Sequence, residues 1–331
     1  MLDRCGEHIL NVHKPSKVAV ITDSNVEPLY AKRVLTSLES SGFDPFLVTL
    51  PAGESTKSMD FLEELYDKLL ENGITRTDLV IALGGGVIGD LTGFCASTLL
   101  RGIPFVQIPT TLLAQVDSSV GGKVAVNLPQ GKNLAGTFYQ PKQVLIDPLC
   151  LSTLTDRVFS DGMAEVIKYG VILDEDLFEK LEKSPSRSEV MDIIEYVIHR
   201  CCTLKAQVVE EDEFDTGKRM ILNFGHTYGH AIEKKYNFST YTHGEAVASG
   251  MVMAAKFGEV NGITPLGTAQ RIKNLVESFN LPSEIEMDKQ TLKDAASVDK
   301  KGKGSIVGLI LPTKIGEVII KDTEKDSIWI Q

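Results

Sequence analysis

The chain has 331 residues, of which 43% are hydrophobic and 24% are charged. This is the composition of a folded globular protein rather than a disordered or fibrous one. The 34 basic and 45 acidic residues give a net charge of −11, and the sequence has no block of five or six consecutive basic residues. We therefore expect no nucleic-acid partner. No apolar stretch has the length of a membrane span or a signal peptide, and the five cysteines lack CxxC spacing. We therefore expect a cytoplasmic protein with reduced thiols and no membrane contact.

Short β-branched runs alternate with segments of helical period in the first half of the chain. The expected strands cover residues 17–22, 46–50, 78–83, 105–109 and 143–147, and the expected helices cover 29–38, 61–70 and 86–98. Strands that alternate with helices form parallel sheets. The pattern predicts an α/β domain, Rossmann-like with a parallel sheet, over residues 1–150.

The pattern changes at about residue 151. Pro185 is the only proline between Pro148 and Pro265, and the apolar spacing becomes helical. Apolar residues at positions 190, 193, 194, 197, 201, 204 and 208 predict a helix with one face in the core. Residues 151–331 are therefore predicted to form a mainly helical domain, which ends in a small β-hairpin built from SIVGLI and GEVIIK.

A glycine-rich turn follows the third expected strand. Gly84, Gly86 and Gly89 fit GxGxxG, and the backbone N–H groups of such a turn can face a pyrophosphate. The acidic residue usual about 20 positions later is missing. Asp23 and Glu54 lie at the ends of other strands and offer carboxylates instead. These residues leave open whether the turn binds a dinucleotide or only packs a strand tightly against a helix.

Three of the six histidines, His226, His230 and His243, lie within eighteen residues. His226 and His230 are four apart and share one helix face. Thr242 and Glu245 form a capping-box pattern that places His243 in the first turn of a new helix. The helix dipole disfavours imidazolium at that position, which leaves a neutral ring able to bind a cation.

Two or three neutral imidazoles and one carboxylate suit Zn²⁺ or a similar divalent ion with an open position for a substrate oxygen. Glu165 in GMAEVIKYG is the best carboxylate, with Lys168 three residues later. The alternative for these two residues is a surface ion pair. Metalloprotease chemistry is excluded, because Thr227 stands where HExxH needs its glutamate.

Two further segments, 115–123 and 131–136, place Lys123 and Lys132 among glycines. They are either solvated loops or part of a ligand site. Ten of the 28 glycines fall between positions 84 and 136, and that density favours a cleft in which the backbone approaches a ligand.

Taken together, the chain resembles the 3-dehydroquinate synthase family over nearly its whole length. The motifs that carry the resemblance are GGGVIGDLTGFCAST, RGIPFVQIPTTLLAQVDSSVGGKVAVN, GKNLAGTF, GMAEVIKYG, KRMILNFGHTYGHAIE, HGEAVASGM and, near the end, Asp299-Lys-Lys301.

The resemblance implies two cofactors. Zn²⁺ (or Co²⁺) would be bound by Glu165, His226 and His243, and His230 would be a proton donor to the substrate, a distinction that spacing alone does not make. The residues expected to contact NAD are Asp23, Glu54, Lys57, Gly85, Gly86, Val87, Asp90, Thr110, Thr111, Asp117, Lys132 and Thr153.

The resemblance also implies the substrate, 3-deoxy-D-arabino-heptulosonate 7-phosphate, and a lyase reaction of the shikimate pathway. The steps would be transient oxidation by NAD, β-elimination of phosphate, re-reduction and intramolecular aldol closure to 3-dehydroquinate. The carboxylate of the substrate would contact Lys205 and Arg219, and its phosphate would contact Lys123, Asn133 and Lys300. The hydroxyl or carbonyl oxygens of the substrate would contact Asn223 and Lys168. Arg101 would come from the second subunit of a homodimer.

Three other functions compete with this interpretation. A metal-dependent polyol dehydrogenase would share the NAD turn and the helical metal domain, but a neutral polyol would leave the anion-binding set of Lys123, Asn133, Lys205 and Arg219 unpaired. A sister sugar phosphate cyclase would act on a substrate without the carboxylate that Arg219 is expected to bind. A non-catalytic zinc module is disfavoured, because ligands with an open position serve no structural purpose.

Overall fold

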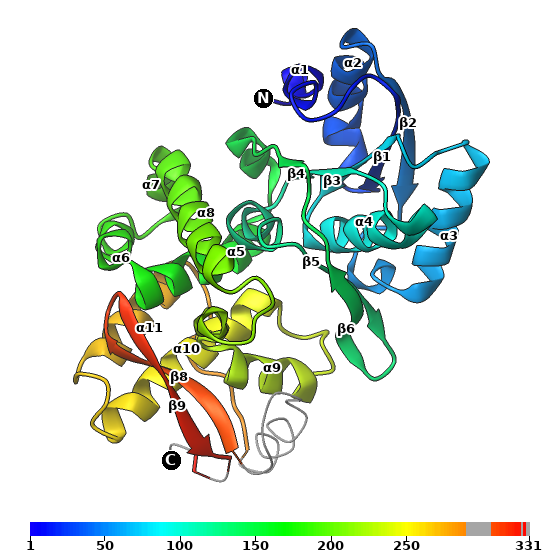
Figure 1. Cartoon of the computed structure of the whole chain (residues 1–331). Helices are drawn as coiled ribbons and strands as arrows, with labels where there is room; N and C mark the ends of the chain where they lie inside the picture. The colour runs from blue at the N-terminus through cyan, green and yellow to red at the C-terminus, as the bar shows by residue number, and fades with distance from the viewer. Residues whose placement is uncertain (289–305, 326, 329–331) are drawn as a thin grey trace. The chain divides into compact units, whose positions relative to one another are not determined.

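The computed structural model describes residues 1–288, 306–325 and 327–328. The chain divides into two compact units, Met1–Leu154 and Thr155–Gln331 (Figure 1). The sequence-based boundary at residue 150 falls inside a short 3₁₀ segment, η6 (Pro148–Thr153), and the second unit starts at the N-cap of the next helix.

The first unit is built on a parallel five-stranded sheet in the order β2-β1-β3-β4-β7. The strands are β1 (Lys17–Asp23), β2 (Asp44–Leu50), β3 (Leu79–Gly84), β4 (Phe105–Pro109) and β7 (Gln143–Val144). In the register, Ile21 of β1 lies opposite Val48 of β2 on one side and Ala82 of β3 on the other. The predicted Rossmann-like fold is confirmed, although β7 has two residues where five were expected.

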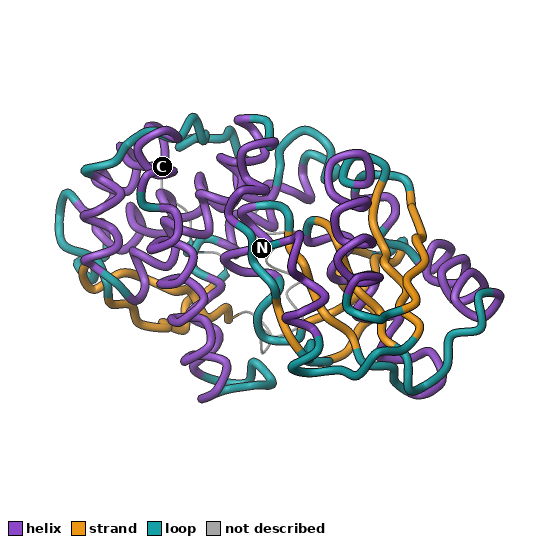
Figure 2. Tube along the Cα trace, turned by 90° about the horizontal axis from the view of Figure 1, so that it is seen from above, coloured by secondary structure: helices purple, strands orange, loops and turns teal. Residues whose placement is uncertain are grey.

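Helices cover both faces of this sheet (Figure 2). Val18 and Val20 point to the face covered by α1 (Cys5–Ile9) and α2 (Lys32–Ser40). The alternate residues Ala19 and Ile21 pack with α3 (Met59–Glu71) and α4 (Gly86–Thr98). Burial on both faces explains the continuous apolar runs of the strands.

The segment 131–136 is a strand, which corrects the view of it as a solvated loop. β5 (Lys123–Leu128) and β6 (Gly131–Phe138) form an antiparallel hairpin with an irregularity between Val126 and Leu128. Gly136 lies against the partner strand, where an added Cβ would stand 2.3 Å from the carbonyl oxygen of Val124. Gly136 therefore serves close strand pairing here.

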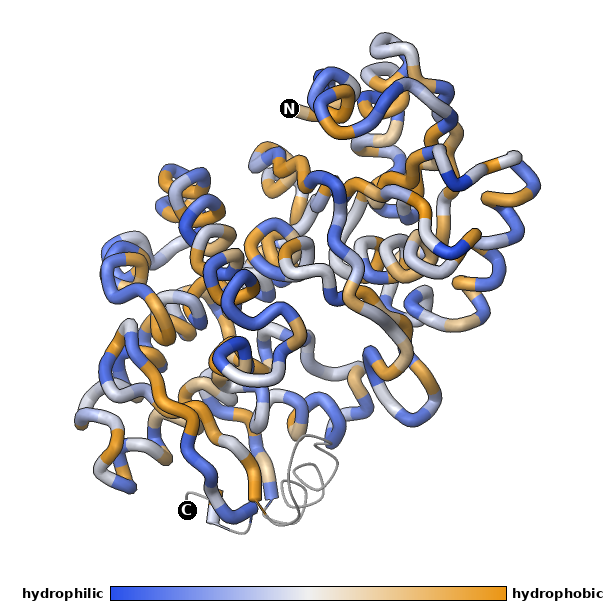
Figure 3. Tube along the Cα trace, in the orientation of Figure 1, coloured by the Kyte–Doolittle hydropathy of each residue, from blue (hydrophilic) through white to orange (hydrophobic). Residues whose placement is uncertain are grey.

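The second unit is mainly helical, as predicted. Its helices are α5 (Asp156–Leu173), α6 (Glu175–Glu182), α7 (Arg187–Asp192), α8 (Ile194–Glu211), α9 (His226–Lys235), α10 (His243–Val260) and α11 (Thr268–Ser278). Hydrophobic and hydrophilic residues alternate along most of them (Figure 3), as expected of helices that bury one face. The predicted hairpin is present as β8 (Ile306–Lys314) and β9 (Glu317–Glu324).

The apolar stripe over 190–208 does not form one helix. The backbone leaves the helical region at Ile193, where φ is −117° and ψ is 14°, and this residue separates α7 from α8. Val190 and Ile194 are nevertheless both buried. No glycine or proline marks the break in the sequence. The apolar spacing is the same on both sides of it, which is why the pattern alone predicted one helix.

All five cysteines are free thiols, and four of them are buried. Among the described residues, every helix is too short or too polar to cross a bilayer.

Candidate active site

Three helices of the second unit bring one carboxylate and two imidazoles together. Glu165 lies in the middle of α5, His226 is the first residue of α9 and His243 the first residue of α10. The Glu165 Oε1 atom is 3.6 Å from His226 Nε2 and 3.4 Å from His243 Nε2. One ligand atom from each residue lies within 4.8 Å of the others, a geometry that can hold a metal ion.

The donor set fits a divalent cation. Both Glu165 carboxylate oxygens are buried: Oε2 forms an ion pair with the Lys168 ammonium, and Oε1 faces the two imidazoles without a hydrogen bond from a described residue. A buried carboxylate without hydrogen bonds is costly unless a cation balances it. One carboxylate and two imidazoles are a ligand set for Zn²⁺ that leaves a coordination position open.

Lys168 supplies a positive charge beside this carboxylate. Its ammonium forms an ion pair with Glu165 Oε2 one helical turn away, and both side chains are almost fully buried. Burial would raise the pKa of Glu165, but the Lys168 ammonium and the His243 imidazole hold that pKa well below its usual value. The alternative of a surface ion pair is therefore wrong: Glu165 and Lys168 do pair, but they do so in the interior of the unit.

The two imidazoles differ in their electrostatic surroundings. Burial lowers the pKa of His226 to about 3, so this ring is neutral at physiological pH. Burial also acts to lower the pKa of His243, but the carboxylates of Glu165 and Glu233 outweigh it and raise this pKa to about 10. Without a bound ion, the helix-dipole argument for a neutral His243 is thus overridden by two acidic neighbours.

His230 lies beside the cluster but outside the ligand group. Its ring centroid is 5.4 Å from that of His226 and 6.4 Å from that of His243, and the residue is exposed. Its position next to the ligands, with access to solvent, suits proton transfer better than metal binding.

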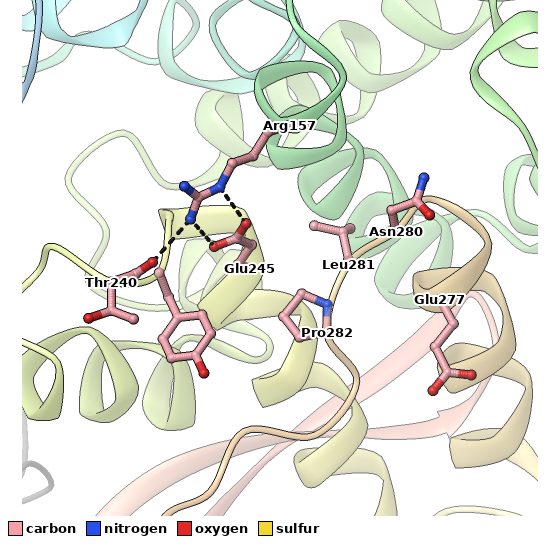
Figure 4. Close-up of a pocket in the computed structure, with 8 residues that line it drawn as sticks. Arg157, Thr240, Glu245, Glu277, Asn280, Leu281 and Pro282 are labelled. Carbon is pink, nitrogen blue, oxygen red and sulfur yellow. Dashed lines mark hydrogen bonds and ion pairs between the residues drawn. The ribbon is translucent and has the colours of Figure 1, made fainter.

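The start of α10 is fixed by three sets of contacts. Thr242 and Glu245 form the predicted capping box. Arg157 donates through Nε and Nη2 to the two oxygens of Glu245, at 2.7 and 2.8 Å, and through Nη2 to the carbonyl of Thr240 (Figure 4). The Gly244 N–H donates to Asp161 Oδ1 at 2.5 Å. Together these contacts hold the turn that delivers His243.

A pocket of about 500 Å³ lies beside this turn, and Figure 4 draws the residues that line it. Its lining includes none of Glu165, His226 and His243; it is formed by Arg157, Thr240, Tyr241, Glu245, Glu277, Asn280, Leu281 and Pro282. Arg157 already engages Glu245 there. The pocket is therefore separate from the ligand group.

The second unit also buries the cations expected to hold a carboxylate. Lys205 in α8 is 6% exposed, and Arg219 in η7 (Lys218–Asn223) is 2% exposed. The Arg219 backbone N–H donates to Asp212 Oδ2 at 3.0 Å, and its Nη1 donates to the carbonyl of Glu213 at 2.6 Å. Asn223 ends the same segment and is half-buried.

All residues expected to contact NAD lie in the first unit, and several of them follow the carboxyl ends of its parallel strands. Asp23 ends β1, Thr110 and Thr111 follow β4, and Gly85 is the N-cap between β3 and α4. An added Cβ at Gly85 would stand 3.0 Å from the Thr111 side chain. This is the edge of a parallel sheet where ligands bind.

Lys57 contacts two residues that the family resemblance places at different ligands, one at NAD and the other at the substrate phosphate. Its buried ammonium forms an ion pair with Asp90, expected at NAD, and donates at 2.5 Å to Oδ1 of Asn133, expected at the substrate phosphate. Asn127, which sequence reasoning missed, links the same group, because its side chain donates to Glu54 and accepts from the Asn133 N–H. Its only signal in the sequence is its place at the end of VAVN before the hairpin turn.

Three further residues were expected at the substrate or its phosphate. Lys123 starts β5 and is exposed. Arg101 is exposed in the turn after α4. Lys300 lies outside the described residues.

Comparison with known proteins identifies the family. The 3-dehydroquinate synthase N-terminal domain matches residues 47–161, and the 3-dehydroquinate synthase C-terminal domain matches residues 162–302. The chain belongs to the 3-dehydroquinate synthase family. A family member from Clostridium acetobutylicum, named 3-dehydroquinate synthase, is 48% identical over 330 residues, which cover 99% of this chain and 93% of that protein.

Two solved structures share the fold over both units. 2-epi-5-epi-valiolone synthase from Streptomyces hygroscopicus, with NAD⁺ and Zn²⁺ bound, has a TM-score of 0.88 at 26% identity and covers 95% of this chain and 89% of its own. 2-Deoxy-scyllo-inosose synthase, complexed with carbaglucose-6-phosphate, NAD⁺ and Co²⁺, has a TM-score of 0.87 at 28% identity. The match covers 99% of this chain and 92% of that synthase. The resemblance expected from the motifs is confirmed.

Proposed function

We propose that this chain is a 3-dehydroquinate synthase, a lyase that converts 3-deoxy-D-arabino-heptulosonate 7-phosphate into 3-dehydroquinate and phosphate in the shikimate pathway. The observation that carries the proposal is the near-complete match to relatives of this name, 48% and 51% identical over 99% and 98% of the chain. Similarity at this level extends across the helices that carry Glu165, His226 and His243.

We propose NAD and Zn²⁺ or Co²⁺ as cofactors, since NAD⁺ and one of these metals are bound in both related synthases. When bound, NAD supplies a reversible hydride acceptor and the divalent ion polarises a substrate oxygen. In this chain, Glu165, His226 and His243 provide the ligand atoms for the ion.

The other polar residues of the second unit bind and orient the substrate. Arg219 and Lys205 are buried cations that match a carboxylate, and the planar fork of Arg219 can bind it through two hydrogen bonds. Lys168 and Asn223 hold hydroxyl or carbonyl oxygens. His230, exposed beside the ligand histidines, moves a proton.

In the first unit, Lys123 and Asn133 are proposed to contact the substrate phosphate, with Lys300 a further candidate. The Lys57 ammonium holds Asn133 through its side-chain oxygen, which leaves the amide NH₂ as a donor for an anion. The same lysine holds Asp90 at the NAD site.

A homodimer that shares Arg101 between subunits completes the proposal. Leu100 and Arg101 both have positive φ values, 51° and 69°. Two consecutive non-glycine residues in this region are strained, and such strain occurs at functional sites. The strained turn supports a role for Arg101 outside the fold of its own unit.

The experiment that tests the reaction incubates the purified protein with the heptulosonate phosphate, Zn²⁺ or Co²⁺ and a trace of NAD. We expect one phosphate released per substrate consumed, many turnovers per NAD and no accumulation of NADH absorbance. NADH that accumulates in step with substrate loss, with phosphate retained on the product, would instead identify a polyol dehydrogenase.

A further inference from the structure

Each ligand histidine has its other ring nitrogen directed at an acceptor. His226 Nδ1 is 3.1 Å from the carbonyl oxygen of Phe224 and can donate to it. His243 Nδ1 is 3.6 Å from Oε1 of Glu233, an ion-pair distance. The Nε2 atoms of both rings are thereby left for Glu165 and the space around it.

Glu233 is placed by the packing of α9 against α10. It lies seven residues after His226, two turns along the same face of α9, and is 3% exposed. Gly229 lies between them, and an added Cβ there would stand 3.2 Å from the Cα of Val247 in α10. This close approach of the two helices brings the Glu233 carboxylate to the first turn of α10.

We propose that Glu233 is a positioning residue for the metal centre, which accepts a hydrogen bond from the Nδ1–H of His243 and so presents Nε2 to the cation. The inference rests on the proposed metal site. Carboxylates commonly orient metal-binding histidines in this way, and their loss typically costs 10–100-fold in metal affinity. Nothing in the reaction chemistry requires Glu233 to touch the substrate.

The alternative is that Glu233 serves only the stability of the helix pair. Asp174 offers a matched control for that role. It is a buried carboxylate of the same unit, caps α6 and pairs with Arg200, and lies outside the ligand group. A purely structural carboxylate and a positioning carboxylate then differ in their effect on the metal.

The first experiment titrates metal-free full-length protein with Co²⁺ and records the visible absorption spectrum. For Glu233→Leu we expect about 10–100-fold weaker binding and a changed Co²⁺ spectrum. Glu233→Gln should lose less, because its amide oxygen still accepts a hydrogen bond. Asp174→Asn should lower Tm while leaving the Co²⁺ affinity and spectrum as in the wild type.

The second experiment reads the histidine tautomer directly. The chain has six histidines, so ¹⁵N-histidine labelling of the Zn²⁺-loaded protein gives few signals. We expect a protected Nδ1–H on His243 in the wild type, weaker protection in Glu233→Gln, whose amide oxygen still accepts, and loss of protection in Glu233→Leu.

The outcomes separate this inference from the proposed function. Wild-type affinity and spectrum in both Glu233 variants, or metal bound through Nδ1 of His243, would overturn the role of Glu233 and leave the metal site standing. Absence of stoichiometric Co²⁺ binding by the wild type would overturn the metal site and the inference with it. If Glu233→Leu does not fold, Glu233→Gln and the tautomer of the wild type decide.

Discussion

Lys168 keeps Glu165 ionised in a place where water cannot. Removal of one partner from a buried ion pair lowers the stability of a protein by about 3–5 kcal/mol. Lys168 and Glu165 are both almost fully buried. Their ion pair means that the site is charged and organised before any substrate arrives. Two imidazoles next to the pair add further ligand atoms within 4.8 Å.

The first prediction separates metal ligands from the proton donor. Glu165→Gln and His243→Ala should lower the metal content per chain, because the first replaces a charged carboxylate ligand with a neutral amide and the second removes a ligand atom. His230→Ala should retain metal and lose about 10²–10⁴-fold in kcat, the scale of general acid–base catalysis. Metal content is measured by atomic absorption and kcat by phosphate release.

Equal metal loss in all three variants would contradict this division of roles. A full metal content and an unchanged kcat in His230→Ala would remove the histidine from the mechanism.

Sequence patterns could predict the cluster but not the division within it. His226 and His230 are four apart, so periodicity places both on one helix face. The structure separates them because His226 stands at the start of α9, next to Glu165, whereas His230 is one turn further and exposed. Glu233 gave no signal of its own, since its partner is ten residues away on another helix.

At the scale of elements, the close packing of α5 against α10 determines where His243 stands. Gly244 sits on Asp161 of α5, and an added Cβ would be 2.1 Å from the Asp161 carbonyl oxygen. Backbone atoms cannot move aside as a side-chain end can. The glycine after His243 is therefore a packing requirement.

Gly244→Ala should consequently lower stability by about 1–3 kcal/mol, as overpacking does, and weaken metal binding by displacing His243. Gly308→Ala is the control, because its Cβ would meet only side-chain atoms of Ile320 and Met220, at 3.3 and 3.6 Å. Urea denaturation and Co²⁺ titration measure the two effects. A Gly244→Ala protein with wild-type stability and metal affinity would show that α10 does not depend on this contact.

The turn before Arg219 depends on one carboxylate. Asp212 accepts hydrogen bonds from the backbone N–H groups of Thr216, Gly217 and Arg219. The bonds from Thr216 and its neighbours lower the pKa of Asp212 to about 2. A carboxyl group whose pKa is lower in the folded state stabilises that state above its unfolded pKa, and the contribution is lost as pH falls through the folded value.

Asp212→Asn should therefore be less stable than the wild type by a constant amount above about pH 4, and the difference should shrink as pH falls toward 2. Free energies of unfolding from urea titrations at several pH values measure this. The variant should also raise KM, since Arg219 lies at the end of the turn. A pH-independent difference would assign the effect to the amide rather than to ionisation.

Elements were predicted best where one strong local signal marks them. The helix 86–98 and the strand 105–109 have the predicted ends, because glycine or proline limits each. The break at Ile193 and the strand β6 were missed. The first lacks any helix-breaking residue, and the second depends on pairing with β5, a contact that local pattern does not contain.

At the scale of the whole molecule, the net charge of −11 coexists with buried cations. Lys57, Lys168, Lys205 and Arg219 are all at most 6% exposed. Lys57 pairs with Asp90 and Lys168 with Glu165, so these buried charges adjoin acidic partners in the interior of an acidic protein. The net charge of the whole chain therefore says little about the charge at its interior sites.

The last prediction concerns the homodimer that shares Arg101. Arg101→Ala and Glu165→Gln should each be inactive as homodimers, because one lacks the shared arginine and the other a metal ligand. In a mixed dimer, one of the two sites then contains both intact residues, so mixing the variants should restore activity. With random exchange, half of the dimers are mixed and each has one good site, which gives about a quarter of wild-type activity. Subunit exchange is confirmed by mass spectrometry of differently labelled chains, and exchange without recovered activity would place Arg101 in the site of its own subunit or outside any site.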